Sequence, residues 1–370
     1  MSRLPKRRLI CLAGLAALCA FQGVFAAESG SPPLVSPELL KHANLKTVWA
    51  NELPIKKTES INRLFLLGNR IYVISDQNYV LSLSRDTGRI VFAKTVAPAG
   101  LLLAGMTLYG DQPLYVNGSS VVQVDAESGV ESKTVNLGRG MTCPASRNSS
   151  HFYLAGVDNR LHVLRAQDAV QTFEVAADSD STITSVLADD NFVIFATAAG
   201  EVISLVPNRP NRLWQFNAAD AIAGPVVRDY MSLFFASKDT NVYRLDMVAG
   251  PEKRRLIWKY QAPGVLEEAP RVTQTVVYQH VRSKGVVAID KQAGSLLWSA
   301  PGGLDLLAES RGKAYVMTET GTLVVMDNAK GKSLYSVNFS GVSKYAANAV
   351  DDKIYITDKR GRMACLQPAE

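Results

Sequence analysis

The residues that most often perform chemistry in proteins are sparse in this chain of 370 residues, and none of them is spaced for catalysis. Its four histidines, at positions 42, 151, 162 and 280, include no His-x3-His pair of the kind that holds a metal ion. His162 alternates with apolar residues in a strand-like segment, which predicts a partly buried structural role. No Gly-x-Ser-x-Gly nucleophile turn occurs. We therefore expect no catalytic residue and no metal ligand.

Two short segments resemble binding motifs but lack a residue that the chemistry requires. Asp178 and Asp180 are spaced like the first ligands of a calcium loop, but Ile183 stands where the sharp turn needs glycine. Residues 331–333, Gly-Lys-Ser, resemble the end of a phosphate-binding loop, yet Met326 replaces its first glycine. This segment also joins two strand-like runs instead of preceding a helix. Both segments are predicted to be polar surface turns.

Basic residues gather in several turns, and one of these turns is unusually long. Residues 248–255 end in Lys253, Arg254 and Arg255, and basic residues also follow other strand-like runs at positions 209, 212, 291, 330 and 332. One interpretation is an ordinary solvated rim. The other is a basic arc that binds an acidic partner or an anionic polymer, with an affinity that falls as salt rises. Lys253, Arg254 and Arg255 are the candidate partner-binding loop.

These turns are positioned by a repeat of short strands. Eight apolar runs lie about 40 residues apart, each followed about eleven residues later by a second apolar run, which is the period of a four-stranded propeller blade. The bulky residues at the centres of the first runs are Tyr72, Tyr115, Tyr153, Ile194, Phe234, Tyr278, Tyr315 and Tyr355. Alternating apolar residues punctuated by Gly, Asp and Asn are typical of all-β chains. We predict an eight-bladed β-propeller of four-stranded antiparallel blades.

Each repeat is expected to begin with an inner strand of small residues and to end with an outer strand that carries a large ring. The inner strands are expected at segments such as 224–227, 269–272 and 347–350. The outer rings are Phe92, Phe173, Trp214, Trp258, Trp298 and Tyr335, while the second repeat has Lys133 at this position. Rings of this size bury roughly 150–250 Å² each, so we expect them to pack between neighbouring blades.

The two ends of the repeat region complement each other. Trp49 lies in an outer-strand pattern before the first complete repeat, whereas the last repeat stops just past Leu366, after its third strand. Pairing these two segments would complete the last blade and leave no long unpaired edge. The sequence therefore predicts a ring that is closed by the N-terminal strand and spans residues 45–367 as one domain.

The repeat of Tyr-Val, Gly, Leu-Asp, Thr-Gly and Trp resembles the quinoprotein-type (PQQ-like) propeller repeat over roughly residues 45–367. An eight-bladed chain of this length, closed by its N-terminal strand, is most similar to the BamB-type periplasmic propellers. The resemblance to quinoprotein enzymes would imply a quinone in the central channel, adjacent cysteines, a tryptophan beneath the quinone and acidic calcium ligands. This sequence has no Cys-Cys pair, and its four tryptophans all lie at outer-strand positions. We expect no cofactor.

Residues 1–26 have the pattern of a secretory signal peptide. A basic start (Arg3, Lys6, Arg7 and Arg8) precedes an apolar run, and Val24 and Ala26 are the small residues expected before a cleavage site. Without these residues the formal charge falls from +6 to +2, with 36 Lys and Arg against 34 Asp and Glu. A charge this small gives no reason to expect a nucleic-acid partner. Residues 27–44 are predicted to form a linker and a short helix that Ser36 caps.

The cysteines bear on anchoring and on the redox state. Cys11 and Cys19 lie in the signal segment, and Leu18 stands where a lipoprotein signal needs a small residue before the lipidated cysteine. The chain departs here from the BamB-type pattern, in which a lipid anchors the propeller. The remaining pair, Cys143 and Cys365, lies in repeats three and eight, which we expect to be too far apart for the ~4.4–6.8 Å Cα separation of a disulfide.

The sequence thus predicts an exported chain, periplasmic or extracellular, that is not an enzyme and has no membrane span once the signal is removed. Its expected role is that of a monomeric scaffold that binds a protein partner in the cell envelope. By resemblance, the sharpest version is a BamB-like outer-membrane protein assembly factor. The alternative is a quinone-dependent dehydrogenase-like enzyme, or another small-ligand enzyme, that uses the central channel.

Overall fold

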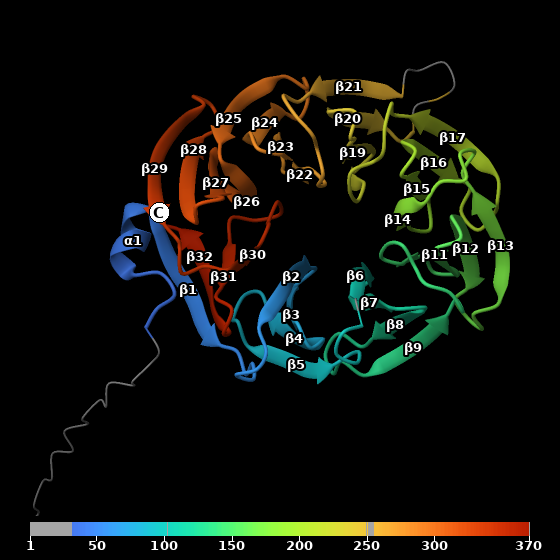
Figure 1. The fold of residues 1–370 in the computed structure, drawn as a ribbon, viewed down its shortest axis with the longest axis horizontal. Helices are drawn as coiled ribbons and strands as arrows, with labels where there is room; N and C mark the ends of the chain where they lie inside the picture. The colour runs from blue at the N-terminus through green and yellow to red at the C-terminus, as the bar shows by residue number, and fades with distance from the viewer. Residues whose placement is uncertain (1–31, 102, 249, 251–254, 370) are drawn as a thin grey trace, which may run out of the picture. The chain divides into compact units, whose positions relative to one another are not determined.

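The computed structural model describes residues 32–369 of the chain, apart from residues 102, 249 and 251–254. The predicted signal peptide, residues 1–26, lies outside the described residues. Residues from Pro33 onward form one compact unit, in which eight four-stranded antiparallel sheets follow one another around a ring (Figure 1). The prediction of an eight-bladed, all-β propeller is confirmed.

Each blade is built from four strands, numbered outward from the ring axis. Blade 1 consists of β2 (Ile61–Leu67), β3 (Arg70–Ser75), β4 (Tyr79–Ser84) and β5 (Ile90–Thr95), and blade 2 of β6 (Leu103–Tyr109), β7 (Gln112–Asn117), β8 (Ser120–Val124) and β9 (Glu131–Asn136). Blade 3 consists of β10 (Ser146–Arg147), β11 (His151–Ala155), β12 (Arg160–Arg165) and β13 (Gln171–Ala176), and blade 4 of β14 (Ile183–Ala188), β15 (Val193–Thr197), β16 (Glu201–Leu205) and β17 (Arg212–Asn217). Blade 5 consists of β18 (Val227–Asp229), β19 (Ser232–Ala236), β20 (Asn241–Asp246) and β21 (Leu256–Gln261), and blade 6 of β22 (Arg271–Val272), β23 (Val276–Val281), β24 (Gly285–Asp290) and β25 (Leu296–Pro301). Blade 7 consists of β26 (Gly303–Ser310), β27 (Lys313–Thr318), β28 (Thr322–Asp327) and β29 (Lys332–Asn338), and blade 8 of β30 (Lys344–Ala346), β31 (Ile354–Thr357), β32 (Arg362–Pro368) and β1 (Leu45–Glu52).

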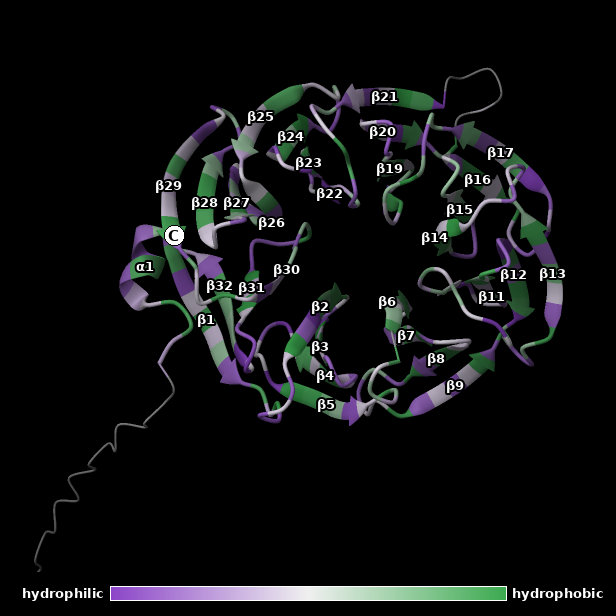
Figure 2. Cartoon of the chain, in the orientation of Figure 1, coloured by the Kyte–Doolittle hydropathy of each residue, from purple (hydrophilic) through white to green (hydrophobic). Residues whose placement is uncertain are grey.

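The core lies between adjacent blades. The eight anchor residues predicted from the repeat all fall on second strands, as Tyr72 does on β3 and Tyr355 on β31. Both faces of these strands are buried, because each blade packs against a neighbour on either side; one apolar cluster joins Tyr72 and Phe92 of blade 1 to Tyr115 of blade 2. The outer strands instead alternate between hydrophobic and hydrophilic residues, as β1 and β13 show in Figure 2.

The inner strands of blades 5, 6 and 8 are shorter than the segments predicted for them. In blade 5 the strand begins at Val227, and in blade 6 at Arg271, both after the predicted proline. In blade 8 the prediction of a strand at residues 347–350 is wrong, because the inner strand is Lys344–Ala346. The Asn348 side chain accepts hydrogen bonds from the backbone N–H groups of Val350 and Asp351, and such local bonds favour a turn over a strand.

The residues predicted at one outer-strand position form a column around the ring, and all of them carry large rings except Lys133 in blade 2. Each member pairs with the third strand at the same place, next to a shift in register. Several members also meet the turn between the third and fourth strands of the next blade. The indole Nε1 of Trp258 donates to the carbonyl of Lys291 at 3.0 Å, and that of Trp298 donates to Asn328 Oδ1 at 3.0 Å.

A glycine in that turn makes room for the ring. A Cβ placed on Gly88 would lie 2.5 Å from the Trp49 ring, one on Gly129 2.5 Å from the Phe92 ring, and one on Gly294 2.6 Å from Trp258 Cγ. All three glycines have a φ near +70°, which other residues rarely adopt. At these three seams, the large ring on one blade therefore requires a glycine on the next.

Lys133 occupies the same column in blade 2, as predicted, and the turn that it meets in blade 3 has no glycine. It lies opposite Gln123 at the usual register shift, and its Nζ donates to the carbonyl of Gln167 in blade 3 at 2.7 Å. The glycine position of the blade 3 turn holds Ala169, with a φ of 60°. The lysine keeps the contact between blades with a thinner side chain that leaves space for a Cβ.

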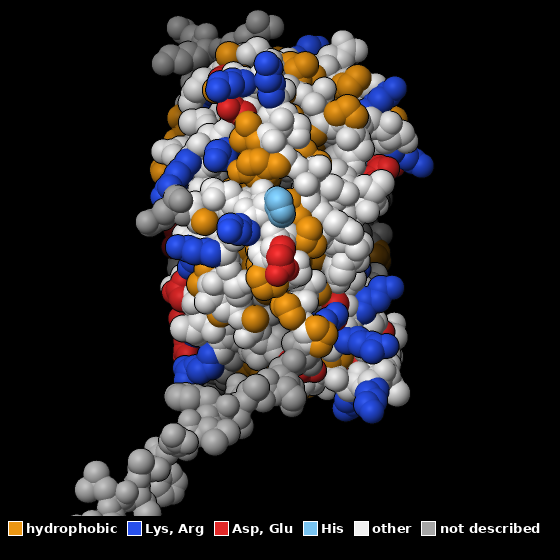
Figure 3. All heavy atoms as spheres, turned by 90° about the vertical axis from the view of Figure 1, so that its left-hand side faces the viewer, with side chains coloured by type: hydrophobic (Ala, Val, Ile, Leu, Met, Phe, Trp, Pro, Cys, Tyr) orange, Lys and Arg blue, Asp and Glu red, His pale blue; other side chains and the backbone are white. Residues whose placement is uncertain are grey.

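A short helix precedes the ring and packs on its outside. Helix α1 (Pro37–His42) begins at the predicted cap, where Ser36 Oγ accepts a hydrogen bond from the Leu39 N–H. Its Leu40 side chain is buried in the apolar cluster between blades 7 and 8. Viewed from the side that carries α1 and β1, apolar side chains occupy the middle of the surface and basic ones lie near both margins (Figure 3).

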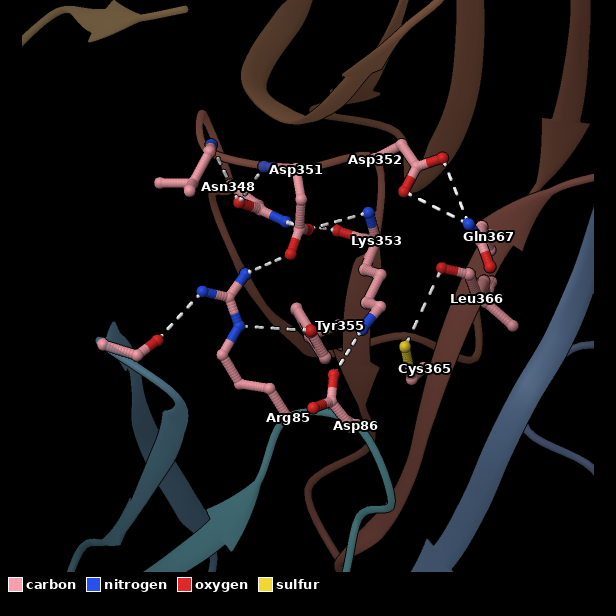
Figure 4. A network of polar contacts seen from close by, with 12 residues as sticks. Arg85, Asp86, Asn348, Asp351, Asp352, Lys353, Tyr355, Cys365, Leu366 and Gln367 are labelled. Atoms are coloured by element: carbon pink, nitrogen blue, oxygen red, sulfur yellow. Dashed lines mark hydrogen bonds and ion pairs between the residues drawn. The ribbon is translucent and has the colours of Figure 1, made fainter. Parts of the chain in front are cut away.

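Strand β1 closes the ring, as the sequence predicted. It pairs antiparallel with β32, and Trp49 lies opposite Cys365 in the column position of blade 8 (Figure 1). Blade 1 is held to this blade by charged groups as well (Figure 4). Arg85 Nη2 forms an ion pair with Asp351 at 2.8 Å, and Lys353 Nζ forms one with Asp86 at 2.6 Å.

Second-strand tyrosines add a polar link at several seams, the boundaries between successive blades. The Tyr355 hydroxyl accepts from Arg85 Nε at 3.3 Å, and the Tyr278 hydroxyl accepts from Asn328 Nδ2 at 2.8 Å. The Tyr153 hydroxyl donates to Asn208 Oδ1 at 2.8 Å. In each case the partner lies in the turn between the third and fourth strands of the next blade, so that turn contacts both the column residue and the tyrosine.

The column predicts very different costs for two truncations. Trp298→Ala should lower the free energy of unfolding by about 3–5 kcal/mol, as for other buried aromatic residues. Lys133→Ala should cost about 1 kcal/mol or less, because it removes one exposed hydrogen bond. Chemical denaturation of both variants measures the difference.

A pair of enlargements serves as the control for this prediction. Lys133→Trp alone should destabilise the protein, because the Cβ of Ala169 occupies the space of the ring, and adding Ala169→Gly should recover much of the loss. Equal costs for Lys133→Ala and Trp298→Ala, or no coupling between the two added substitutions, would show that the column does not hold the blades together.

Closure of the ring by β1 predicts that stability changes abruptly with the residue at which the chain begins. A chain that starts at residue 45 should lose only the packing of α1 relative to one that starts at residue 33. A chain that starts at residue 55 also lacks β1, and should lose more than the ~3–5 kcal/mol of a single buried aromatic. Urea denaturation of the three chains tests this order. Similar midpoints for starts at 45 and 55 would contradict it.

Candidate protein-binding face

The two ends of the blades differ in the loops that they carry. At one end, which we call the upper face, the first strand joins the second and the third joins the fourth. At the other end, the second strand joins the third and the chain crosses to the next blade. Arg255, the described member of the predicted partner-binding loop, directly precedes β21 and lies on the upper face of blade 5. Loops that a rigid scaffold holds in place are common sites of binding.

Of the three basic residues predicted for this loop, Lys253 and Arg254 lie outside the described residues. Arg255 is described, and its Nη1 donates to the carbonyls of Asp246 at 2.6 Å and Met247 at 2.8 Å. Its guanidinium lies 4.2 Å above the centre of the Trp214 ring in blade 4. Burial lowers the pKa of this guanidinium. Arg255 thus ties the base of the loop to the neighbouring blade, while its role in binding stays a prediction.

Other turn cations also make contacts within the ring. Lys291 is only 6% exposed, and its Nζ donates to the carbonyl of Thr273 and forms an ion pair with Asp229 at 2.6 Å. Arg212 makes a two-pronged contact with Asp178, at 2.9 and 3.0 Å. On the side shown in Figure 3, basic side chains lie near both faces of the ring. Lys291 is therefore not part of an exposed arc, and the described basic residues of that side do not gather on one face.

The upper face of blade 5 carries three exposed apolar side chains that the sequence analysis did not single out. Tyr230 and Met231 form the turn between β18 and β19 and are 83% and 55% exposed, and Val248 in the turn after β20 is 68% exposed. The two turns adjoin, because the Met247 N–H donates to the Met231 carbonyl at 2.9 Å. Single exposed apolar residues are ordinary, but a group of them indicates an interaction site. We call these three residues the blade 5 apolar cluster.

Tyr230 holds an unusual backbone conformation. Its φ is 49°, and the equivalent turn positions of blades 1, 2 and 7 are Gly68, Gly110 and Arg311. Left-handed backbone costs a residue with a side chain roughly 1–2 kcal/mol. Arg228 helps to hold the turn, because its Nε donates to the Tyr230 carbonyl at 2.8 Å. A strained, exposed aromatic residue that the ring does not need is a reason to infer function.

Among the described residues no three His, Cys, Asp or Glu side chains are grouped to hold a metal ion. His162 is buried, as predicted, and its Nε2 lies 3.0 Å from Asp158 Oδ1. Burial raises the pKa of the Cys143 and Cys365 thiols to about 12, so both stay protonated and are poor nucleophiles at neutral pH. No helix in the described part of the chain has the length and apolar character of a membrane span.

Comparison with known families gives one match in sequence. Residues 199–370 match the family model described as outer membrane protein assembly factor BamB. This confirms the resemblance that the repeat predicted. The matched segment contains the blade 5 apolar cluster and the candidate loop. No curated protein matches the sequence.

Solved structures extend the likeness to the whole ring. The crystal structure of BamB from Moraxella catarrhalis superposes with a TM-score of 0.67 at 16% identity, covering 87% of this chain and 97% of that one. The computationally designed Ika8 protein superposes with a TM-score of 0.64 at 15% identity, covering 85% and 98%. At such low identity the likeness concerns the fold alone.

The contacts of Arg255 predict that it contributes to stability. Arg255→Met should lower the free energy of unfolding by about 1–2 kcal/mol, because two carbonyls lose their donor and the Trp214 ring loses its cation. Arg209→Met, in the corresponding turn of blade 4, should change it by about 0.5 kcal/mol or less. Thermal and urea unfolding of both variants test the comparison, and equal effects would contradict the assigned role.

Proposed function

We propose that the mature chain is an exported scaffold that binds another protein in the cell envelope, and that it acts without catalysis. The sharpest form of this proposal is a role like that of BamB, as an outer-membrane protein assembly factor. The match of residues 199–370 to the BamB model supports this role. The signal pattern of residues 1–26 supports export to the periplasm or beyond. We also propose that the mature chain is monomeric, with no nucleic acid or cofactor.

The observation that carries the proposal is the blade 5 apolar cluster. A protein partner that covered Tyr230, Met231 and Val248 would bury apolar area that now faces solvent, which favours association. Tyrosine is common among the few residues that dominate binding energy, because it offers a large rigid ring and a polar tip. Arg228 helps to hold the turn of Tyr230 in place, so little conformational entropy is lost there when a partner binds.

The charges of the loop would make a second, weaker contribution to partner binding. Lys253 and Arg254 would attract acidic groups on the same partner, and that attraction should weaken with salt. Arg255 would act mainly by fixing the base of the loop through its contacts with Asp246, Met247 and Trp214. The test of loop charge therefore reverses only Lys253 and Arg254, because reversing Arg255 would also disturb the fold.

The alternative from the sequence is an enzyme that uses a quinone or another small ligand in the central channel. It rests on the repeat, which scaffolds and enzymes share. The four tryptophans lie in or beside the contacts between blades, as Trp49, Trp258 and Trp298 show by donating to the turns of the following blades. Their positions give this alternative no specific support.

The proposal predicts that Tyr230→Gly weakens partner capture without loss of stability. Glycine adopts the positive φ without strain, so Tm should stay the same or rise. Losing a binding residue of this kind costs about 2 kcal/mol or more, which is about a 30-fold weaker Kd. The measurement is the recovery of envelope proteins on the immobilised mature chain, residues 27–370, followed by the Kd of the protein recovered.

Arg311→Gly is the matched control, because Arg311 occupies the same turn position in blade 7 with a φ of 48°. It should leave capture unchanged. A photo-crosslinking amino acid at position 230, but not at position 311, should attach to the captured protein. Equal capture by wild type and Tyr230→Gly, or equal crosslinking at both positions, would show that blade 5 is not the binding surface. Reversal of Lys253 and Arg254 should lower capture at low salt only.

A further inference from the structure

Three second-strand tyrosines depart from the pattern of polar links between blades. The hydroxyls of Tyr72, Tyr115 and Tyr315 are buried and have no hydrogen-bond partner among the described residues. A buried polar group without a partner is rare, and each case calls for an explanation. Those of Tyr153, Tyr278 and Tyr355 are all bonded. The difference must lie in what the next blade presents to the hydroxyl.

The turn of the next blade explains two of these cases. At the blade 8–blade 1 seam the second residue of that turn is Arg85, and at the blade 6–blade 7 seam it is Asn328; each side chain reaches the tyrosine. The same position is Ala126 at the blade 1–blade 2 seam and Ala166 at the blade 2–blade 3 seam. For Tyr315 no such turn exists, because the third and fourth strands of blade 8 come from opposite ends of the chain.

The two alanine seams differ in what surrounds the alanine. At the blade 1–blade 2 seam the upper face is hollowed by about 510 Å³, lined by Leu67, Arg70, Asp86, Leu108, Asp111 and Glu127 beside Ala126. At the blade 2–blade 3 seam Arg147 lies 3.9 Å above the Tyr109 ring, and its Nη1 donates to Gln123 Oε1. Tyr109 and Arg147 take the places of Leu67 and Leu108, so an arginine occupies that seam.

The seam between blades 8 and 1 shows what the hollow is shaped to hold. There the Arg85 guanidinium donates to the Tyr355 hydroxyl, to the Gly68 carbonyl at 3.0 Å and to Asp351 (Figure 4). An ion pair between Lys353 and Asp86 lies beside it. The hollow has the counterpart of this ion pair, between Arg70 and Glu127, and the counterpart of the tyrosine, Tyr72. It has no counterpart of the Arg85 guanidinium, because Ala126 stands at that position.

The charges around Tyr72 suit a cation. Three carboxylates, on Asp86, Asp111 and Glu127, line the hollow against the single guanidinium of Arg70. Asp86 and Glu127 are already paired, whereas Asp111 is exposed and forms no ion pair with the described residues. Ala126, which lines the hollow, stands at the turn position from which Arg85 reaches Tyr355, and by that equivalence the Tyr72 hydroxyl faces Ala126. Burial raises the pKa of Tyr72, and the nearby Ser82 hydroxyl lowers it. Ser82, opposite Tyr72 in the sheet, is also buried without a partner.

We propose that the hollow between blades 1 and 2 is a binding pocket for an arginine side chain of a protein partner. The aliphatic stem would lie on Leu67 and Leu108, and the guanidinium would donate to the Tyr72 hydroxyl and to Asp111. A planar guanidinium matches a carboxylate better than an ammonium does, so arginine is preferred to lysine. The pocket lies on the upper face, in blades other than that of the apolar cluster. Its role in the cell rests on the protein-binding function proposed above, but its affinity for arginine can be tested separately.

The orphan hydroxyl provides the first test. Tyr72→Phe removes a group that has no partner in the protein, so the Tm of the mature chain should stay the same or rise. Tyr355→Phe is the matched control, because it takes an acceptor from Arg85 and should lower Tm. If Tyr72→Phe lowers Tm as much as Tyr355→Phe, the Tyr72 hydroxyl is already satisfied and the proposal is overturned.

The second test uses small probes of known charge. N-acetyl-arginine amide should shift the amide NMR signals of residues around the hollow, such as Gly68 and Asp111. Its Kd should be about tenfold tighter than that of N-acetyl-citrulline amide, which has the same shape without the charge, since charge-assisted hydrogen bonds are roughly twice as strong as neutral ones. Tyr72→Phe and Asp111→Asn should each weaken arginine binding at least threefold.

The third test fills the hollow with an arginine side chain of the protein itself. Ala126→Arg places a guanidinium where Arg85 lies in the preceding seam, and it should abolish binding of the arginine probe. Ala166→Arg, the same substitution at the seam that Arg147 occupies, should leave probe binding intact. Equal affinity for arginine and citrulline, equal affinity for N-acetyl-lysine amide, or undiminished binding to Ala126→Arg would each overturn the proposal. These outcomes do not involve Tyr230, so they are distinct from failure of the proposed scaffold role.

Discussion

The contact that recurs most clearly between blades joins an aromatic side chain on the outer strand of one blade to a glycine in the turn of the next. Trp49 with Gly88 and Trp258 with Gly294 show it: a Cβ on either glycine would overlap the aromatic ring, so the two blades must match at both positions. Lys133 with Ala169 shows how a seam departs from it. Where this contact occurs, it helps to set the spacing of the blades.

Closure of the ring uses the same kind of contact, between blade 8 and blade 1. Strand β1 completes blade 8, and it also brings Trp49 against Gly88 of blade 1. The same blades are joined by Arg85 and Lys353, whose charges lie next to the point where the ring closes. The seam made last in chain order thus has apolar packing and ion pairs together. A seam that joins distant parts of a chain must offset a larger loss of chain entropy, and these contacts serve that end.

Much of this architecture could be predicted because it depends on repetition. The column, the closing strand and the cap at Ser36 each leave a local or periodic signal, and all three were found in the sequence. The inner strand of blade 8 was misplaced because Asn348 bonds to its own backbone, an effect that no period reveals. Lys291 looked like an exposed turn cation, and only the three-dimensional register places its amine between blades 5 and 6.

The residues that bear on function were missed for a related reason: they are departures from the repeat. Tyr230 stands where blades 1 and 2 have glycine, and Ala126 stands where the seams before blades 1 and 7 have Arg85 and Asn328. Neither change disturbs the contact between ring and glycine, so the fold tolerates both. One adds an exposed aromatic side chain, and the other removes a filling side chain and leaves Tyr72 without a partner. In a propeller held together by one repeated contact, aligning the blades with one another and examining the positions that differ is therefore a direct way to locate binding sites.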